Sequence, residues 1–320
     1  MSDPIVYAVA SGKGGVGKTT TAVNLTAAFA TGDRSSVVVD ADLGMATLAT
    51  SLGDVEGPTL YDVLADGVPV EEASYDGGGF AFVPGGGTLE GYADADPGGL
   101  GDVVETLRDS FDVVVLDVGA GLSHDTIVPL GLADEILLVS TPETAALESA
   151  ERVHELAERL DTPVTGLVLT RVTEANERAT EAVEAAVGVP VLAVVPDDEV
   201  VYESAAIGSP VVTNAPQSPV TAAYVDLAEA LCDRLGEDLR SEPVPEGTAT
   251  GETVLAGLAG PERAREVAGS GCSEGDPESG DDVAAPGSDA ADPDGEGDAE
   301  DSDRDDGGGS GGFFSRLFGR

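Results

Sequence analysis

Lysine is nearly absent from this sequence. Its 320 residues contain 15 basic side chains against 61 acidic ones. Only two of the basic residues, Lys13 and Lys18, are lysines, and the others are arginines. A sequence that uses arginine everywhere else has kept both lysines within six positions. This placement indicates a chemical task at that point of the chain.

The shortage of basic residues leaves a formal net charge of −46. Such a charge repels itself and opposes compaction unless salt screens it, because the Debye length falls from about 10 Å at 0.1 M salt to about 3 Å at 1 M. The composition therefore favours a halophilic, high-salt cytoplasm. A mesophilic acidic protein with a disordered tail is the alternative, but it does not account for the acidic body. DNA is not expected as a partner, since nonspecific DNA binding requires a basic surface that neutralises phosphates.

Cysteine and long apolar runs are also scarce. Cys232 and Cys272 form neither a CxxC metal pair nor a disulfide framework, and two reduced thiols are the simpler interpretation. The first residues, MSDPIVYAVASGKGG, are too polar for a signal peptide. No apolar run approaches the ~18 residues that span a bilayer. We therefore expect a cytosolic protein, or one held on the inner face of the cell membrane.

Apolar runs alternate with helix-like stretches over residues 1–240. The runs are nearly continuous, as in parallel strands buried on both faces, and they cover residues 5–11, 36–42, 80–86, 111–119, 135–142, 165–172 and 190–198. Helices are expected at residues 19–31, 146–160, 180–188 and 224–239. This alternation predicts an α/β fold with a doubly wound, mostly parallel sheet flanked by helices, and ligands at the carboxyl ends of its strands.

The composition changes abruptly after residue 240. Residues 273–306 hold fifteen acidic side chains and one arginine, from which no core can form. GGGSGG, at 307–312, adds a flexible joint. Residues 241–272 are ambiguous and could contain one weak helix or two. We therefore predict a disordered linker over 241–312 between a folded domain at 1–240 and a terminal segment at 313–320.

That terminal segment is apolar, although the linker before it is not. Drawn as a helix, FFSRLFGR places Phe313, Phe314, Leu317 and Phe318 on one face. Eight residues cannot hold a helix in water, so this one should fold only on contact with a surface. A membrane surface is the interpretation we favour. A peptide that docks on a protein partner and a frayed terminus are the alternatives.

The most specific chemical motif is GKGGVGKT, which lies between the first predicted strand and the first predicted helix. It fits the P-loop pattern G-x-x-x-x-G-K-[ST], in which glycines turn backbone N–H groups toward phosphates and the helix N-terminus adds positive charge. Lys18 is expected to bridge the β- and γ-phosphates, and the Thr19 hydroxyl to ligate Mg²⁺. The motif predicts ATP and Mg²⁺ as cofactors, with nucleotide contacts at Gly12, Lys13, Gly14, Gly15, Val16, Gly17, Lys18, Thr19 and Thr20.

The additional lysine in this motif carries a family resemblance. KGGxGK[ST] is similar to the deviant Walker motif of the MinD/ParA group of P-loop NTPases, which belong to the SIMIBI type. In that family, the additional lysine reaches across an ATP-sandwich homodimer to the partner's phosphates, much as an arginine finger does. The resemblance thus implies a catalytic role for Lys13 in trans, beside Lys18 in cis.

Three aspartates follow the same resemblance. VVVDADLGMATL resembles the family's DxDxGxxxL motif, which implies that Asp42 positions the attacking water and that Asp40 helps to hold the Mg²⁺ water shell. VVVLDVGAGL resembles its Walker B motif, which implies that Asp117 supports the same ion. Any one of these acids alone would fit a turn or a helix cap. Three at strand ends in this order favour a functional site.

The base-binding residues are also expected from the resemblance. LVLTRV is similar to the family's adenine-side strand, although it has Thr170 and Arg171 where the family often has Asn-Arg. The segment that begins at Pro196 and Asp198 resembles the one that runs over the base. Glu143 either touches the partner's nucleotide or serves as an ordinary acid at a helix start.

Taken together, the motifs resemble the MinD branch of the family over residues 1–240 and the last eight residues. The implied activity is hydrolysis of ATP to ADP and phosphate by a Mg·ATP-dependent homodimer. The dimer would bind the cytoplasmic membrane and position a division site, polar array or appendage, together with an unidentified protein regulator or cargo. One alternative is a ParA-like partition or cargo-positioning ATPase. The other is a weakly hydrolysing scaffold that tethers a partner through its tail.

Overall fold

Eight strands form one sheet in the computed structural model, which describes residues 4–53, 55–121, 124–176 and 178–235. Their order is β3-β4-β2-β5-β1-β6-β7-β8, and every neighbouring pair is parallel except β3 and β4. The strands are β1 (Ile5–Ser11), β2 (Ser36–Ala41), β3 (Tyr75–Asp76), β4 (Ala81–Val83), β5 (Val113–Ala120), β6 (Glu135–Ser140), β7 (Val164–Val172) and β8 (Val191–Pro196). The doubly wound, mostly parallel fold predicted from the sequence is confirmed.

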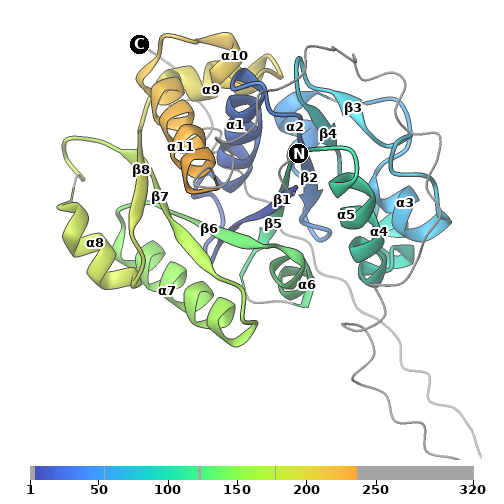
Figure 1. Cartoon of the computed structure of the whole chain (residues 1–320), viewed down its shortest axis with the longest axis horizontal. Coiled ribbons are helices and arrows are strands. Elements are labelled where there is room, and N and C mark those ends of the chain that lie inside the picture. Colours follow the sequence, from blue (N-terminus) through green and yellow to red (C-terminus); the bar gives the residue numbers. More distant parts are fainter. Residues whose placement is uncertain (1–3, 54, 122–123, 177, 236–320) are drawn as a thin grey trace, which may run out of the picture. The chain divides into compact units, whose positions relative to one another are not determined.

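Helices cover both faces of the sheet. Figure 1 shows α1 and α11 on one side and α6 and α7 on the other. The described helices are α1 (Lys18–Thr31), α2 (Leu48–Leu52), α3 (Leu60–Asp66), α4 (Leu89–Asp94), the 3-10 turn η1 (Pro97–Gly99), α5 (Leu100–Arg108), α6 (His124–Leu132), α7 (Thr144–Arg159), α8 (Thr180–Val187), α9 (Glu199–Ala206), α10 (Val211–Asn214) and α11 (Pro219–Leu235).

The core consists of two apolar layers separated by the sheet. Alternate residues of β1 belong to different layers, with Val6 and Ala8 in one and Tyr7 and Val9 in the other. The first layer contains side chains of α5 and α7, and the second contains side chains of α1 and α11. Burial on both faces explains why the strands form continuous apolar runs rather than alternating with polar residues.

The strand order brings the predicted chemical residues to one edge. β5 lies between β1 and β2, and within that arrangement Asp117 pairs with Val9 on one side and with Asp40 on the other. The loop that follows β1 therefore begins beside two acidic strand ends. Crevices at the carboxyl ends of parallel strands are where open α/β sheets bind ligands.

Short elements account for the differences from the sequence prediction. All seven predicted strands are present, but the one expected at 80–86 ends at Val83, because Pro84 lacks an N–H and three glycines follow it. The closing helix begins at Pro219 rather than Tyr224. The two-residue β3 and the helices α2, α3, α4, α5, α6, α9 and α10 were not predicted, and most of these segments are too short to show a periodicity.

The predicted linker at 241–312 and the apolar tip at 313–320 lie outside the described residues, as do the last positions of the expected closing helix. Within the described ranges, no helix combines the length and the apolar character needed to cross a membrane.

Candidate nucleotide site

The loop between β1 and α1 requires glycine at three positions. Gly15 and Gly17 have φ angles of 75° and 95°, in the left-handed region that side chains rarely adopt. At Gly12, a Cβ atom would overlap the backbone carbonyl of Ser149 in α7. The loop thus lies directly against α7 and turns sharply into α1, which begins at Lys18. A glycine-rich loop that leads into a helix N-terminus is the arrangement that binds phosphates, through backbone N–H groups and the positive end of the helix dipole.

Thr170 of β7 braces this loop from the side. Its hydroxyl lies 2.6 Å from the carbonyl oxygen of Val16 and 3.2 Å from that of Ser140, and the side chain is buried. A Cβ on Gly17 would lie 3.7 Å from the Thr170 side chain. The Thr170 hydroxyl is therefore bonded to the backbone, while the residue also lines the cavity described below, and the expected adenine contact at Thr170 stays a prediction.

Two buried carboxylates lie beside the loop. Asp40 and Asp117 are 0% and 1% exposed. Oδ2 of Asp40 accepts hydrogen bonds from the backbone N–H groups of Thr47, at 2.9 Å, and Leu48, at 2.8 Å. Burial raises the pKa of Asp40, and the neighbouring Asp117 carboxylate raises it further. Burial also raises the pKa of Asp117, against the lowering effects of the Thr19 hydroxyl and the Lys18 charge.

The surroundings of Asp117 fit a magnesium ion held together with a nucleotide. Oδ1 of Asp117 is buried and has no hydrogen-bond partner among the described residues. The Thr19 hydroxyl, an oxygen ligand of the kind Mg²⁺ prefers, lies 2.8 Å from that of Thr47. Across the described part of the chain, no three His, Cys, Asp or Glu side chains gather as a metal cage of their own. Mg²⁺ usually takes one or two protein carboxylates and completes its shell with phosphates and water.

Asp42 begins the loop after β2 and lies beside the end of β5. Its Oδ1 accepts a hydrogen bond of 3.0 Å from the backbone N–H of Met45. A Cβ on Gly119 would lie 3.1 Å from the same oxygen, so glycine at that position lets β5 approach closely. The three aspartates predicted from the sequence are thus brought together at one edge of the sheet.

Lys13 points to a different neighbour than Lys18. Its Nζ lies 2.6 Å from Oε2 of Glu143, which directly precedes α7, and both side chains are exposed. The hydrogen bond and charge of Lys13 lower the pKa of Glu143. Lys18, by contrast, lies close enough to Asp117 for its charge to lower that pKa. The two lysines therefore occupy distinct positions, one at the buried acids and one on the outer surface.

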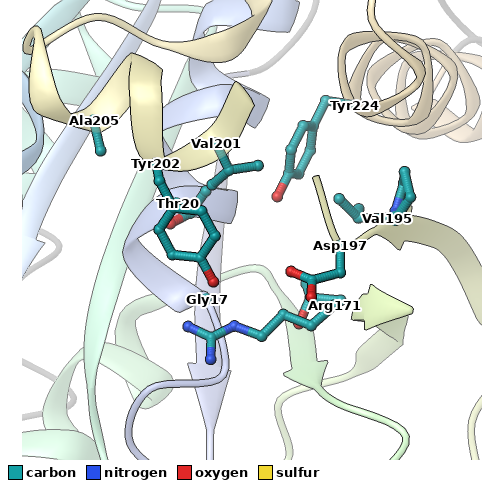
Figure 2. A pocket seen from close by; sticks show the side chains of 11 residues that line it. Gly17, Thr20, Arg171, Val195, Asp197, Val201, Tyr202, Ala205 and Tyr224 are labelled. Carbon is teal, nitrogen blue, oxygen red and sulfur yellow. The ribbon is translucent and has the colours of Figure 1, made fainter. Parts of the chain in front are cut away.

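A cavity of about 120 Å³ adjoins the loop on the β7–β8 side (Figure 2). Figure 2 shows Tyr202 of α9 and Arg171 at the end of β7 on the side of the cavity where α1 begins. The Arg171 backbone has a φ of 54°, which is uncommon for a residue with a side chain. The lining residues are Gly17, Thr20, Thr170, Arg171, Val195, Pro196, Asp197, Val201, Tyr202, Ala205 and Tyr224.

The cavity lining contains residues that the sequence did not indicate, and the expected contact of Asp198 with the base stays a prediction. Asp198 was expected over the base, but its Oδ1 accepts a hydrogen bond of 3.0 Å from the backbone N–H of Val200 and caps α9. Asp197 lines the cavity instead, and Pro196 lines it as expected. Tyr202 and Tyr224 were not predicted to line the cavity, because the sequence around a tyrosine in a helix does not indicate which cavity the side chain faces.

A model of the CobQ/CobB/MinD/ParA nucleotide-binding domain matches residues 7–211. The chain belongs to this family. The matched range contains the loop, the three aspartates and nearly all of the cavity lining, so the CobQ/CobB/MinD/ParA domain coincides with the geometry described above.

Individual relatives place the chain near MinD within this family of ATP-binding proteins and ATPases. It is 36% identical over 231 residues to an uncharacterised ATP-binding protein of Methanocaldococcus jannaschii, covering 71% of this chain and 87% of that one. It is 31% identical over 237 residues to the septum site-determining protein MinD of Synechocystis, covering 71% and 88%. The structure of Pyrococcus horikoshii MinD complexed with Mg-ADP matches with a TM-score of 0.69 and 33% identity, covering 73% and 98%.

The raised pKa of Asp117 yields a stability prediction for the nucleotide-free protein. A carboxyl whose pKa is higher in the folded state costs stability as the pH rises from its ordinary pKa to the raised one. We expect Asp117→Asn to raise the melting temperature by about 2–6 °C at pH 7.5, and by less at pH 4.5, where the carboxyl is protonated. Thermal unfolding in molar salt at both pH values measures the difference.

Glu148→Gln is the matched control, since it removes the same charge from an exposed position on α7. It should change the melting temperature little at either pH. A lower melting temperature for Asp117→Asn at pH 7.5 would show that the Asp117 carboxylate stabilises the fold rather than costing stability.

Proposed function

We propose that this protein is a MinD-like ATPase that dimerises on Mg·ATP, binds the cytoplasmic membrane through its C-terminal tip and positions a cellular structure. The observation that carries the proposal is that its two lysines lie in different environments. Lys18 lies at the buried acids of its own subunit, whereas Lys13 is an exposed residue of the loop and pairs with Glu143. An exposed lysine on the phosphate loop is available to a second subunit.

Residues of the loop and of two strand ends would carry the reaction. Mg·ATP, when bound, supplies the phosphoryl group and the cation that neutralises part of its charge. Lys18 adds a fixed positive charge at the start of α1, and the Thr19 hydroxyl offers an oxygen ligand. Asp117, through its unpaired Oδ1, and Asp40 would orient water around the ion. Asp42, at the entrance of the site, would hold the attacking water in line.

The cavity beside the loop would take the adenine base. Its walls include Val195, Pro196 and Val201, which are apolar, and its rim carries the polar side chains of Arg171 and Asp197. Apolar walls with a few polar groups at the rim are typical of sites for flat ligands. The similar Pyrococcus MinD was solved with Mg-ADP, which supports an adenine nucleotide as the ligand.

The pair between Lys13 and Glu143 would have to open in the dimer. Both side chains are solvent-exposed, at 44% and 64%, and exposed ion pairs contribute little to stability. Lys13 can therefore exchange its own Glu143 for the phosphates of a second subunit. Glu143, released by the same step, would then lie beside that subunit's nucleotide.

The apolar tip supplies the proposed membrane contact. Phe313, Phe314, Leu317 and Phe318 would each gain roughly 1.5–3 kcal/mol on burial, less the cost of ordering the segment. One such tip should bind only marginally and reversibly. Two tips on one dimer would bind far more tightly, because the second binds at a high effective concentration. ATP-dependent dimerisation would thus load the membrane, and hydrolysis would release it.

Lys13→Ala tests the role of the exposed lysine. We expect its ATP dissociation constant to stay within a few-fold of the wild-type value and the protein to remain monomeric with Mg·ATP. Turnover should fall by at least about 100-fold, since a charge supplied in trans has a large effect on the rate of such reactions. Light scattering and phosphate release in molar salt measure both effects. Arg159→Ala, which removes an exposed cation from the far end of α7, should behave as wild type. ATP-dependent dimers with normal turnover in Lys13→Ala would rule out the trans role.

Asp42→Ala separates hydrolysis from binding. Turnover should fall by about 100-fold or more while the ATP dissociation constant changes less than about threefold, because the side chain acts on the attacking water and not on the nucleotide. Dimers should accumulate with ATP, as measured by size-exclusion chromatography. Unaltered turnover would show that Asp42 does not position the water.

Truncation after Gly312 tests the membrane contact. We expect a tagged, truncated protein to lose its membrane distribution in living cells and to stop floating with vesicles in molar salt. Arg316→Gln should keep most of the binding, because salt screens its attraction to anionic lipid. An unchanged membrane distribution after truncation contradicts the anchor, and a nucleoid distribution would favour a ParA-like role instead.

A further inference from the structure

A tyrosine outside the phosphate site holds the loop that carries Asp42. Tyr61 of α3 is 6% exposed, and its hydroxyl donates a hydrogen bond to the carbonyl oxygen of Leu43. Leu43 directly follows Asp42, and its own side chain is buried in the same core layer as the Tyr61 ring. The backbone next to the Asp42 carboxylate is therefore joined to a different helix.

The position of the Tyr61 ring is tightly determined. A Cβ on Gly86 would overlap the ring, and one on Gly91 would lie 2.7 Å from its Cδ2 atom. The start of α3 is fixed by a capping box, in which the Asp62 carboxylate accepts a 2.7 Å hydrogen bond from the backbone N–H of Thr59. The Tyr61 ring is therefore packed against backbone on one side and held by a capped helix on the other. Because the ring is fixed, its hydroxyl is fixed as well.

The rest of the loop is anchored from within the site. Asp40 accepts hydrogen bonds from Thr47 and Leu48, at the far end of the loop, and Asp42 accepts one from Met45. These bonds involve carboxylates that the proposed reaction also uses, so they respond to whatever binds there. The bond from Tyr61 comes from α3 and ends on the backbone carbonyl of Leu43, so it does not involve either carboxylate.

We propose that Tyr61 is a positioning residue for hydrolysis, whose hydroxyl sets the backbone at Leu43 and thereby the direction of the Asp42 carboxylate. This role rests on the proposed function, in which Asp42 orients the attacking water. Tyr61 touches neither water nor nucleotide in this role. It should affect turnover and leave nucleotide affinity alone, because the P-loop and the base cavity have no part in the contact.

Tyr61→Phe, compared with Tyr75→Phe, isolates this effect. Both changes delete one phenolic hydroxyl that donates to a backbone carbonyl, since the Tyr75 hydroxyl lies 2.8 Å from the carbonyl oxygen of Pro58. Tyr75 is part of β3, at the edge of the sheet, and its bond ends on Pro58, next to the Thr59 cap of α3. This variant therefore also tests whether a looser start of α3 is enough to disturb the Asp42 loop. The pair controls for the general cost of losing a tyrosine hydrogen bond.

Two measurements on the full-length protein in molar salt test the proposal. In Tyr61→Phe, kcat should fall by about 3- to 10-fold, the loss expected from one hydrogen bond, while the ATP dissociation constant stays within about twofold. Without nucleotide, hydrogen–deuterium exchange should rise in the peptide covering residues 42–48. Tyr75→Phe should change neither quantity.

The outcomes separate this role from the proposed function. If wild type hydrolyses no ATP, the proposed function fails, and raised exchange at 42–48 in Tyr61→Phe alone still supports Tyr61 as the residue that sets the loop. Unchanged exchange and unchanged kcat overturn the proposal. So does a parallel loss of kcat and nucleotide affinity in both variants, because that pattern reflects stability alone.

Discussion

Asp40 and Asp117 face each other across the paired strands β2 and β5, and both carboxylates lie in the interior of the protein. Burial and mutual repulsion raise the pKa of Asp40, and burial raises that of Asp117. Such a pair is costly unless positive charge compensates it. The Lys18 charge and the Thr19 hydroxyl, at the start of α1, stabilise the charged form of Asp117, and the backbone N–H groups of Thr47 and Leu48 stabilise that of Asp40. The surrounding geometry follows from that requirement.

Around this pair of carboxylates, backbone at glycine positions packs closely against neighbouring elements. Gly12 lets the phosphate loop lie against α7, and Gly119 lets β5 approach Asp42. Gly86 makes room for the Tyr61 ring, which in turn holds the carbonyl of Leu43. Glycines at these positions serve packing between elements as much as turning of the chain. A site built in this way can hold its carboxylates in place before any ligand is present.

Because the whole chain is strongly acidic, its few cations are important for binding an anionic ligand. With a net charge of −46, most of the surface repels anions, and a nucleotide needs a local exception. Lys13, Lys18 and Arg171 provide one around the loop and the cavity. The exposed charge of Lys13 is paired with Glu143, so less of this positive charge faces an incoming anion while the pair is closed.

The fold class and the phosphate loop could be predicted from the sequence alone, because continuous apolar runs and a glycine-rich motif are local patterns, and the family resemblance implied the three aspartates. The contacts between distant elements required the tertiary structure. In it, the Thr170 hydroxyl bonds to the backbone, and Lys13 pairs with a residue 130 positions away. Asp198 caps a helix, and Asp197 lines the cavity. Tyr61 is also joined to Leu43. Sheet register and helix packing set such contacts, and spacing along the chain does not record them.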